Sequence, residues 1–198
     1  MAHAHSQLYG LAATGLRFFT VYCPWGRPDM AYFLFSIAII QGRPITLFNH
    51  GRMRRDFTYI DDVTEAMERL LDHIPRADPG WSGEHPDPGT SSAPYVGNSR
   101  AIEPDYLVGL LERALNRPAI RQYGAMQAGD VPETWADIAD LAKDIGFEPR
   151  TSIEDSIFRF AEWYRGYHAE AHESGAPPRK NKSGSRGQAK QESTSCVA

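Results

Sequence analysis

The chemistry open to this sequence is limited by two patterns that it does not contain. A phenol becomes acidic enough to act as a general base when an ammonium lies beside it, as in the pair Tyr-x-x-x-Lys. No Tyr is followed four residues later by Lys, because the first lysine of the chain is Lys143. No Gly-x-Gly-x-x-Gly or Gly-x-x-Gly-x-x-Gly follows an apolar run, so the usual dinucleotide phosphate loop is missing. The sequence as given therefore has no general base suited to oxidising a carbinol.

Metal and thiol chemistry have only weak candidates. His168 and His172 have the i, i+4 spacing of a helix, but no third ligand accompanies them, so we expect no metal site. The two cysteines, Cys23 and Cys196, lie far apart, which excludes a disulfide framework and a zinc site. A reactive thiol at Cys23 is an alternative, although no His or Lys lies nearby in the sequence to lower its pKa.

The composition indicates one globular α/β unit. The chain has 198 residues, of which 41% are hydrophobic, and a formal net charge of −4. Nucleic-acid binding is not expected, because phosphate-backbone binders need clustered positive charge. The longest apolar run, Ala31–Ile40, is too short to cross a bilayer, and no leader opens the sequence, so we expect a cytoplasmic protein without membrane contact. The last residues are rich in Ser, Gly, Lys and Gln, and we expect 169–198 to be a disordered basic tail.

The first elements would place a loop at the edge of a parallel sheet. Met1–Tyr9 is typical of the end of a helix closed by Gly10, and the apolar run Leu16–Tyr22 predicts a strand covered on both faces. Cys23–Asp29, with two prolines and a glycine, follows as an ordered loop. In doubly wound folds, ligands bind at this carboxyl edge of the strands.

The remaining segments predict short strands alternating with helices. Met30–Gln41 is apolar almost all round and predicts a buried helix. Further strands are expected at Ile45–Phe48, Asp56–Ile60 and Tyr95–Asn98, a turn at Asn49–Gly51, helices at 61–74 and Pro104–Leu115, and a long loop at Pro75–Pro94. Two capping boxes, Thr134 with Asp137 and Thr151 with Glu154, predict the starts of two more helices.

Four motifs, in order, carry a family resemblance. They are LRFFTVYCPWGRPDM from Leu16, RRDFTYIDD from Arg54, QAGDVPETWAD from Gln127 and FAEWYRGYH from Phe160. Together they resemble extended short-chain dehydrogenase/reductases of the NAD-dependent epimerase/dehydratase family, and in particular the UDP-glucuronate 4-epimerase group, whose pattern is LRFFTVYGPWGRPDM. The resemblance extends from residue 1 to about residue 168.

This resemblance implies a fold and an activity. Residues 1–168 would be the C-terminal part of a Rossmann-type fold: the last sheet strands and a small mixed α/β domain that binds the nucleotide sugar. The family's Tyr-x-x-x-Lys pair would lie a few residues before Met1. The implied reaction is inversion at C4 of UDP-glucuronate through a 4-keto sugar with bound NAD. The chain alone is expected to be inactive.

The resemblance also assigns roles to seven residues. Phe19 would back the nicotinamide of NAD, Thr20 would face the sugar, and Arg27 would point a cation toward the carboxylate of the substrate. Arg55 would hold the diphosphate and Asp130 would approach the ribose hydroxyls. The backbone at two further residues would meet the uracil: Leu47 and Phe48. No catalytic residue and no metal ligand is assigned.

Simpler interpretations of these residues remain open. Arg55 could form a surface ion pair with Asp56 or Asp61, and Arg27 could brace its loop through Asp29. Thr20 is also an ordinary strand residue, and Asp130 could simply cap a turn.

One departure from the family pattern and two rival functions also remain. Cys23 stands where the family has Gly, and it would strain the substrate loop if that glycine is used for a positive φ or for a close approach of the backbone. The chain could belong to another family enzyme, such as a UDP-sugar decarboxylase or dehydratase. It could also be a non-catalytic remnant that binds UDP-sugar or a partner. An uncovered strand Leu16–Tyr22 would favour a homo-oligomer, or a partner that covers the sheet edge.

Overall fold

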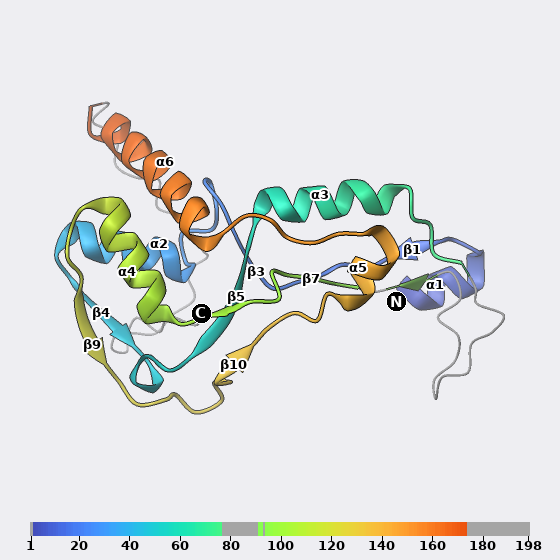
Figure 1. Cartoon of the computed structure of the whole chain (residues 1–198), viewed down its shortest axis with the longest axis horizontal. Helices are drawn as coiled ribbons and strands as arrows, with labels where there is room; N and C mark the ends of the chain where they lie inside the picture. Colours follow the sequence, from blue (N-terminus) through green and yellow to red (C-terminus); the bar gives the residue numbers. More distant parts are fainter. Residues whose placement is uncertain (1, 77–90, 93, 174–198) are drawn as a thin grey trace, which may run out of the picture.

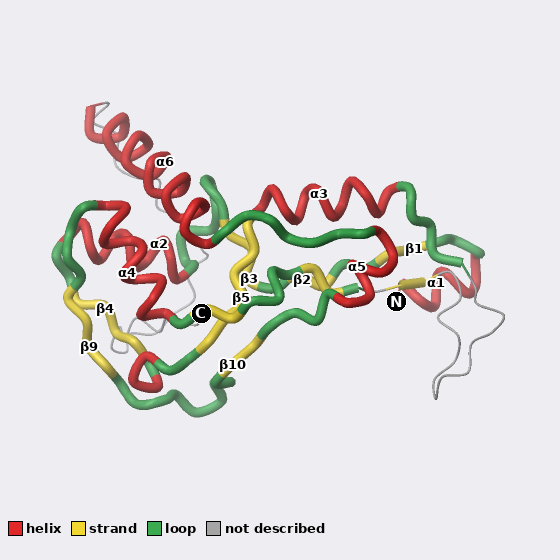
Figure 2. Tube along the Cα trace, in the orientation of Figure 1, coloured by secondary structure: helices red, strands yellow, loops and turns green. Residues whose placement is uncertain are grey.

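The computed structural model describes residues 2–76, 91–92 and 94–173 and shows an α/β chain (Figures 1 and 2). The helices are α1 (Ala2–Tyr9), α2 (Ala31–Gln41), η1 (a 3-10 turn, Asn49–Gly51), α3 (Ile60–Leu71), α4 (Pro104–Leu115), α5 (Ala139–Ile145) and α6 (Ile153–Glu173). The strands are β1 (Ala13–Thr14), β2 (Arg17–Phe18), β3 (Thr20–Tyr22), β4 (Pro44–Leu47), β5 (Arg54–Tyr59), β6 (Ser91–Ser92), β7 (Tyr95–Val96), β8 (Ala101–Ile102), β9 (Ile120–Tyr123) and β10 (Glu133–Thr134). None of the helices in these ranges is both long and apolar enough to cross a membrane.

Strand β5 is the centre of the largest sheet. It pairs in parallel with β3 and with β10, and β8 pairs with it in the antiparallel sense. There are also three two-stranded parallel sheets, which pair β1 with β6, β2 with β7 and β4 with β9. In Figure 1, α2, α4 and α6 gather with β4 and β9 at one end of the molecule, while α3, α5 and α1 lie toward the other.

The predicted strand Leu16–Tyr22 is present, but it is divided into β2 and β3, which pair with different strands. Its parallel pairing was predicted correctly. The expected cover on both faces is wrong for β2, because Arg17 and Phe18 are exposed. The apolar run indicated the strand type, whereas its cover depends on elements that the run cannot specify.

The main core lies between α2, α4 and α6 and is rich in aromatic rings. Tyr22 makes edge contacts with the rings of Tyr32, Phe57 and Tyr59, and its hydroxyl hydrogen-bonds to Ser156 of α6. Burial raises the pKa of the Tyr22 phenol. This phenol is therefore a structural group that ties β3 to α6 and stays protonated at neutral pH.

The carboxylate of Asp56 is fully buried and joins three segments. It accepts hydrogen bonds from the backbone N–H groups of Asn98 (3.0 Å), Ser99 (2.9 Å) and Ala136 (3.0 Å). Burial raises the pKa of Asp56, while these N–H groups oppose that rise by stabilising the charged form. A second carboxylate, Asp62 in the first turn of α3, accepts from the N–H groups of Arg150 and Thr151 and from the Thr151 hydroxyl.

Both predicted capping boxes are wrong in detail, although a helix follows each of them. Thr134 lies in β10, and α5 begins only at Ala139. Thr151 bonds to Asp62, and the hydroxyl of Ser152 instead accepts from the N–H of Asp155 at the start of α6 (3.0 Å). Thr134 lies in a paired strand, and the Thr151 hydroxyl bonds to a distant carboxylate. Neither side chain therefore caps the helix that the local pattern assigned to it.

The other predicted elements are confirmed within a few residues, and Gly10, Gly42 and Gly146 all have positive φ where helices end. Most of the predicted loop Pro75–Pro94 and the tail beyond residue 173 lie outside the described residues. Helix α6 continues past residue 168 to Glu173.

Helix α4 is fastened to β9 by a partly buried ion-pair group. The guanidinium of Arg121 donates to both carboxylate oxygens of Glu112 at 2.8 Å and to Asp105 at 2.8 Å. The hydrogen bonds from Arg121 lower the pKa of Glu112 below its ordinary 4.5.

We expect the free energy of unfolding of Glu112→Gln to fall less between pH 7 and pH 3 than that of the unchanged chain. A lowered folded-state pKa means that Glu112 contributes stability above about pH 4.5 and loses it as the pH falls through the lower value. The variant should lose about 1 kcal/mol of unfolding free energy at pH 7 and much less at pH 3, measured by urea titration. The exposed Glu148→Gln is the control. Equal losses at both pH values would contradict this account.

We expect Asp56→Ala to destabilise the fold severely. It would leave three backbone N–H groups without their acceptor, at a cost of about 3 kcal/mol or more in the free energy of unfolding. The exposed Asp72→Ala should stay within about 0.5 kcal/mol of the unchanged chain. A small loss for Asp56→Ala in urea titration would show that the carboxylate is replaceable.

Candidate functional site

The loop after β3 contacts helix α6 through Trp25 and helix α2 through a hydrogen bond from Tyr32. Trp25 has a positive φ of 66° and packs its ring against Trp163 (5.0 Å between centroids) and Tyr167 (5.3 Å) of α6. The hydroxyl of Tyr32 donates to the carbonyl of Cys23 at 3.4 Å. A Cβ on Gly26 would lie 1.8 Å from that same hydroxyl oxygen, so only glycine fits there. The predicted ordered loop is confirmed, and it lies at the carboxyl end of β3.

Cys23 does not have the positive φ that was one possible reason for the family's glycine. It is absent from the positive-φ residues, and Trp25, two residues on, has that conformation instead. Burial, and then the negative charge of Asp61, raise the pKa of the Cys23 thiol. A raised pKa disfavours the nucleophilic thiolate, so the structure argues against the reactive-thiol alternative.

Arg27 is in the same loop and pairs with Asp29. Its Nε donates to Oδ1 of Asp29 at 3.0 Å, and a second guanidinium nitrogen donates to Oδ2. Both side chains are exposed, at 75% and 61%. The bracing ion pair considered from the sequence is therefore present, but an exposed pair of this kind is weak and readily exchanged.

Arg55 is buried on β5 and lies close to Asp130. The side chain is only 7% exposed, and its Nη1 donates to the carbonyl of Arg54 at 3.0 Å and to that of Pro132 at 3.5 Å. Burial lowers the pKa of Arg55, and the charge of Asp130 opposes this shift. The alternative partners are engaged elsewhere: Asp56 with backbone N–H groups, and Asp61 with Arg159.

Three further predicted contacts lie at the end of β4 and on β3. Leu47 ends β4 with its side chain in the core, and its carbonyl accepts from the N–H of Gly124 (3.0 Å). Phe48 is half-buried just before the turn η1. Thr20 is half-buried and pairs with Phe57, two residues along β5 from Arg55. Pairing of β5 with β3 thereby positions Arg55 and Thr20, whereas the end of β4 is positioned by its pairing with β9.

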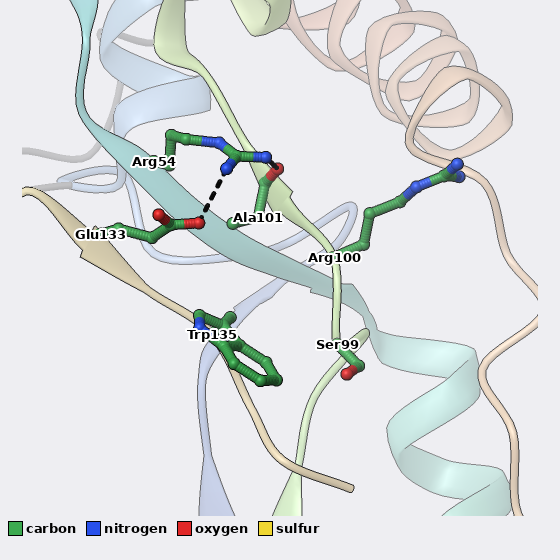
Figure 3. A pocket seen from close by; sticks show the side chains of 6 residues that line it. All are labelled: Arg54, Ser99, Arg100, Ala101, Glu133 and Trp135. Atoms are coloured by element: carbon green, nitrogen blue, oxygen red, sulfur yellow. Dashed lines mark hydrogen bonds and ion pairs between the residues drawn. The ribbon is translucent and has the colours of Figure 1, made fainter.

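A separate cavity lies on the other face of β5 (Figure 3). It measures about 320 Å³ and is lined by Arg54, Ser99, Arg100, Ala101, Glu133 and Trp135. Arg54 donates to Glu133 at 2.9 Å and to the carbonyl of Ala101 at 3.1 Å, which joins β5 to β10 and β8. Because successive strand side chains point to opposite faces, Arg54 points away from the side of Arg55. This cavity contains none of the residues that the sequence predicted.

The described residues contain no glycine-rich phosphate loop of the Gly-x-Gly-x-x-Gly type. A phosphate loop needs glycines that leave the backbone open to the ligand. At Gly26 and Gly97 the space beside the backbone is filled by Tyr32 and Ala136. Phe19, the one predicted NAD contact, is half-buried with its ring edge-on to Tyr95 (5.8 Å).

Comparison with known proteins identifies the family. Residues 1–81 match the model of the NAD dependent epimerase/dehydratase family. The protein CapI of Staphylococcus aureus is 48% identical over 172 residues, which are 85% of this chain and 52% of CapI. The chain belongs to the NAD-dependent epimerase/dehydratase family. The resemblance inferred from the four motifs is thus confirmed.

Further relatives agree with this assignment. A probable UDP-glucuronate 4-epimerase of Rhizobium meliloti is 44% identical over 178 residues, which are 87% of this chain and 52% of that protein. The solved structure of MoeE5 with UDP-glucuronic acid and NAD superimposes with a TM-score of 0.65 at 28% identity, covering 79% of this chain and 48% of MoeE5. The α/β fold is therefore part of the Rossmann-type fold of the extended short-chain dehydrogenase/reductases. The chain spans about half the length of these epimerase-family relatives.

We expect Cys23 to react slowly with thiol reagents. Burial keeps its thiolate fraction at pH 7 below that of an unperturbed cysteine, and the reaction should speed up as the pH rises. The measurement is the rate of maleimide labelling in a Cys196→Ser background, compared with the same protein unfolded in urea. Labelling of the folded protein at or above the rate for the unfolded protein would contradict a raised pKa for Cys23.

Proposed function

We propose that this chain is the nucleotide-sugar-binding half of an epimerase that inverts C4 of UDP-glucuronate. Recognition of the UDP-sugar is the part that these residues would supply. The NAD-dependent redox chemistry of the reaction would belong to the dinucleotide-binding half of the fold. The observation that carries the proposal is the buried guanidinium of Arg55 on the central strand, beside Asp130.

Burial is what suits Arg55 to a diphosphate. A cation screened from water interacts more strongly with an anion than an exposed one does, and the guanidinium fork matches phosphate oxygens. Burying the charged guanidinium is unfavourable in the free protein, as the lowered pKa of Arg55 indicates. A bound diphosphate would offset this unfavourable desolvation free energy. Asp130, on the adjoining segment, would then accept from the ribose hydroxyls.

The nucleoside and the sugar would lie on either side of this diphosphate. Leu47 ends β4 and Phe48 follows it, and the backbone of these two residues would meet the uracil. Thr20, at the start of β3, would face the sugar. Arg27 would exchange Asp29 for the sugar carboxylate, a swap between two similar anions that an exposed ion pair permits at little cost. This exchange would favour UDP-glucuronate over neutral UDP-sugars.

Calorimetric titration of the chain with UDP tests the proposal through Arg55. We expect Arg55→Ala to weaken UDP binding about 30-fold or more, because a charge-assisted contact to phosphate in a buried site is lost. Arg43→Ala removes an exposed guanidinium that bonds only to Gln41 among the described residues, and this variant should bind UDP as the unchanged chain does. Urea titration of both variants checks that they remain folded. No UDP binding by the unchanged chain, or equal binding by Arg55→Ala, would overturn the proposal.

Sugar selectivity tests Arg27 separately. We expect the chain to bind UDP-glucuronate more tightly than UDP-glucose by roughly 5-fold to 30-fold, the range for one exposed to partly buried carboxylate contact. Arg27→Ala should remove this difference and leave the affinity for UDP unchanged. A difference that survives the substitution would place the carboxylate elsewhere.

A further inference from the structure

Trp25 has a backbone conformation that a large side chain rarely adopts. Its φ of 66° lies in the left-handed region, and such conformations persist only where the surrounding structure enforces them. The side chain is 73% exposed, so burial in a core does not explain why a tryptophan occupies this position. Strained residues of this kind concentrate at functional sites, and Trp25 lies two residues before Arg27 in the loop after β3.

Two aromatic rings of α6 hold the ring of Trp25. Trp163 and Tyr167 are one helical turn apart, and their rings stack with 5.3 Å between centroids and 19° between the planes. The ring of Trp25 contacts both of them. Trp163 in turn contacts the buried rings of Phe33 and Phe160. The loop after β3 is thereby fastened, through Trp25, to the aromatic core that α6 shares with α2.

Backbone hydrogen bonds join the strained residue to Arg27. The N–H of Gly26 donates to the carbonyl of Cys23 at 3.2 Å, and the N–H of Met30 donates to the carbonyl of Arg27 at 3.3 Å. Gly26 is the single residue between Trp25 and Arg27, so the backbone direction at Trp25 sets where the Arg27 side chain begins. A change at the ring of Trp25 would therefore move the guanidinium two residues away.

An ordered loop matters because the contact expected of Arg27 is an exposed one. An exposed carboxylate contact contributes little free energy, and the entropy lost in ordering a flexible loop on binding would cancel it. A loop that is already held before the ligand arrives avoids this loss. The carboxylate contact can then appear as a preference for one sugar over another.

We propose that Trp25 is a positioning residue that determines the preference for a carboxylated sugar. Its ring, held by Trp163 and Tyr167, keeps the loop after β3 in the conformation that presents Arg27. This inference rests on the nucleotide-sugar recognition proposed above and adds a residue to it. The affinity for UDP itself does not depend on Trp25, because the diphosphate contact belongs to Arg55 on β5.

Three variants separate the ring of Trp25 from its backbone strain. Trp25→Gly removes the ring but suits a positive φ, Trp25→Phe keeps an aromatic ring, and Tyr167→Ala removes a partner on α6. We expect the preference for UDP-glucuronate over UDP-glucose to fall to about 2-fold or less in Trp25→Gly and Tyr167→Ala, and to stay within about 2-fold of its original value in Trp25→Phe.

Calorimetric titration with UDP, UDP-glucuronate and UDP-glucose measures this preference. The affinity for UDP should stay within about 2-fold of that of the unchanged chain in all three variants, because a loop contact to the carboxylate does not act on the diphosphate. Phe158→Ala is the control: it removes another exposed ring of α6 (50%) and should keep the preference.

Hydrogen exchange measures the loop without any ligand. The N–H groups of Gly26 and Met30 should exchange faster in Trp25→Gly and Tyr167→Ala than in the unchanged chain, because the loop opens more often once its anchor is lost. The N–H of Ala136, which donates to the buried carboxylate of Asp56, should exchange at its original rate.

Four outcomes would overturn the positioning role and leave UDP recognition standing. They are a preference that survives Trp25→Gly, a preference lost equally in Trp25→Phe, unchanged exchange at Gly26 and Met30, and a chain that binds UDP without preferring UDP-glucuronate. Loss of UDP binding in Trp25→Gly together with the preference would show a structural role instead. No UDP binding by the unchanged chain would overturn the proposed function and this inference with it.

Discussion

The carboxylate of Asp56 holds together three segments that lie far apart in the sequence. It is on the central strand β5, and its acceptors are filled by N–H groups from the turn after β7 and from the segment between β10 and α5. A buried charge is tolerated only when such donors surround it, so separating any of the three segments would leave the carboxylate short of a donor. This constraint fixes the face of β5 on which each neighbouring side chain lies. Arg55, the next residue, is thereby directed to the opposite face, toward Asp130.

Alternation along β5 therefore puts the structural side chains on one face and the side chain proposed to bind the diphosphate on the other. Arg54 and Asp56 share one face, where they join β10, β8 and the turn after β7. Arg55 and Phe57 share the other face, where Phe57 enters the aromatic core. The cavity of Figure 3 lies on the structural face, and its arginine is already paired with Glu133. For this reason the buried Arg55, and not the visible cavity, is the better guide to the ligand.

Local patterns predicted most of the elements. The apolar run before Gly42, the proline at the start of α4 and the glycine that ends α5 each act within a few residues, so helices α2, α4 and α5 were found from the sequence. Strands β1, β6, β8, β9 and β10 were not foreseen. Most have only two residues, and pairing with distant segments defines them, which no local pattern contains. The capping role of Ser152 was missed because Asp62 takes the neighbouring Thr151.

The candidate site was predicted through family motifs, and the structure adds the physical setting of each residue. Sequence reasoning could not show that Arg55 is buried, or that Trp25 and not Cys23 has the positive φ. These properties come with contacts to α6 and to the segment around Asp130, whereas the Arg27–Asp29 pair lies within one loop and could be considered from the sequence. They also determine the roles proposed for the two arginines, a fixed diphosphate contact and an exchangeable carboxylate contact.

The most direct test of this account is a crystal structure of the chain with UDP-glucuronate. The account predicts the diphosphate at the guanidinium of Arg55, the uracil beside Leu47 and Phe48, and the sugar carboxylate on Arg27 released from Asp29. A nucleotide bound in the cavity of Arg54 and Trp135, or a diphosphate held without Arg55, would contradict it.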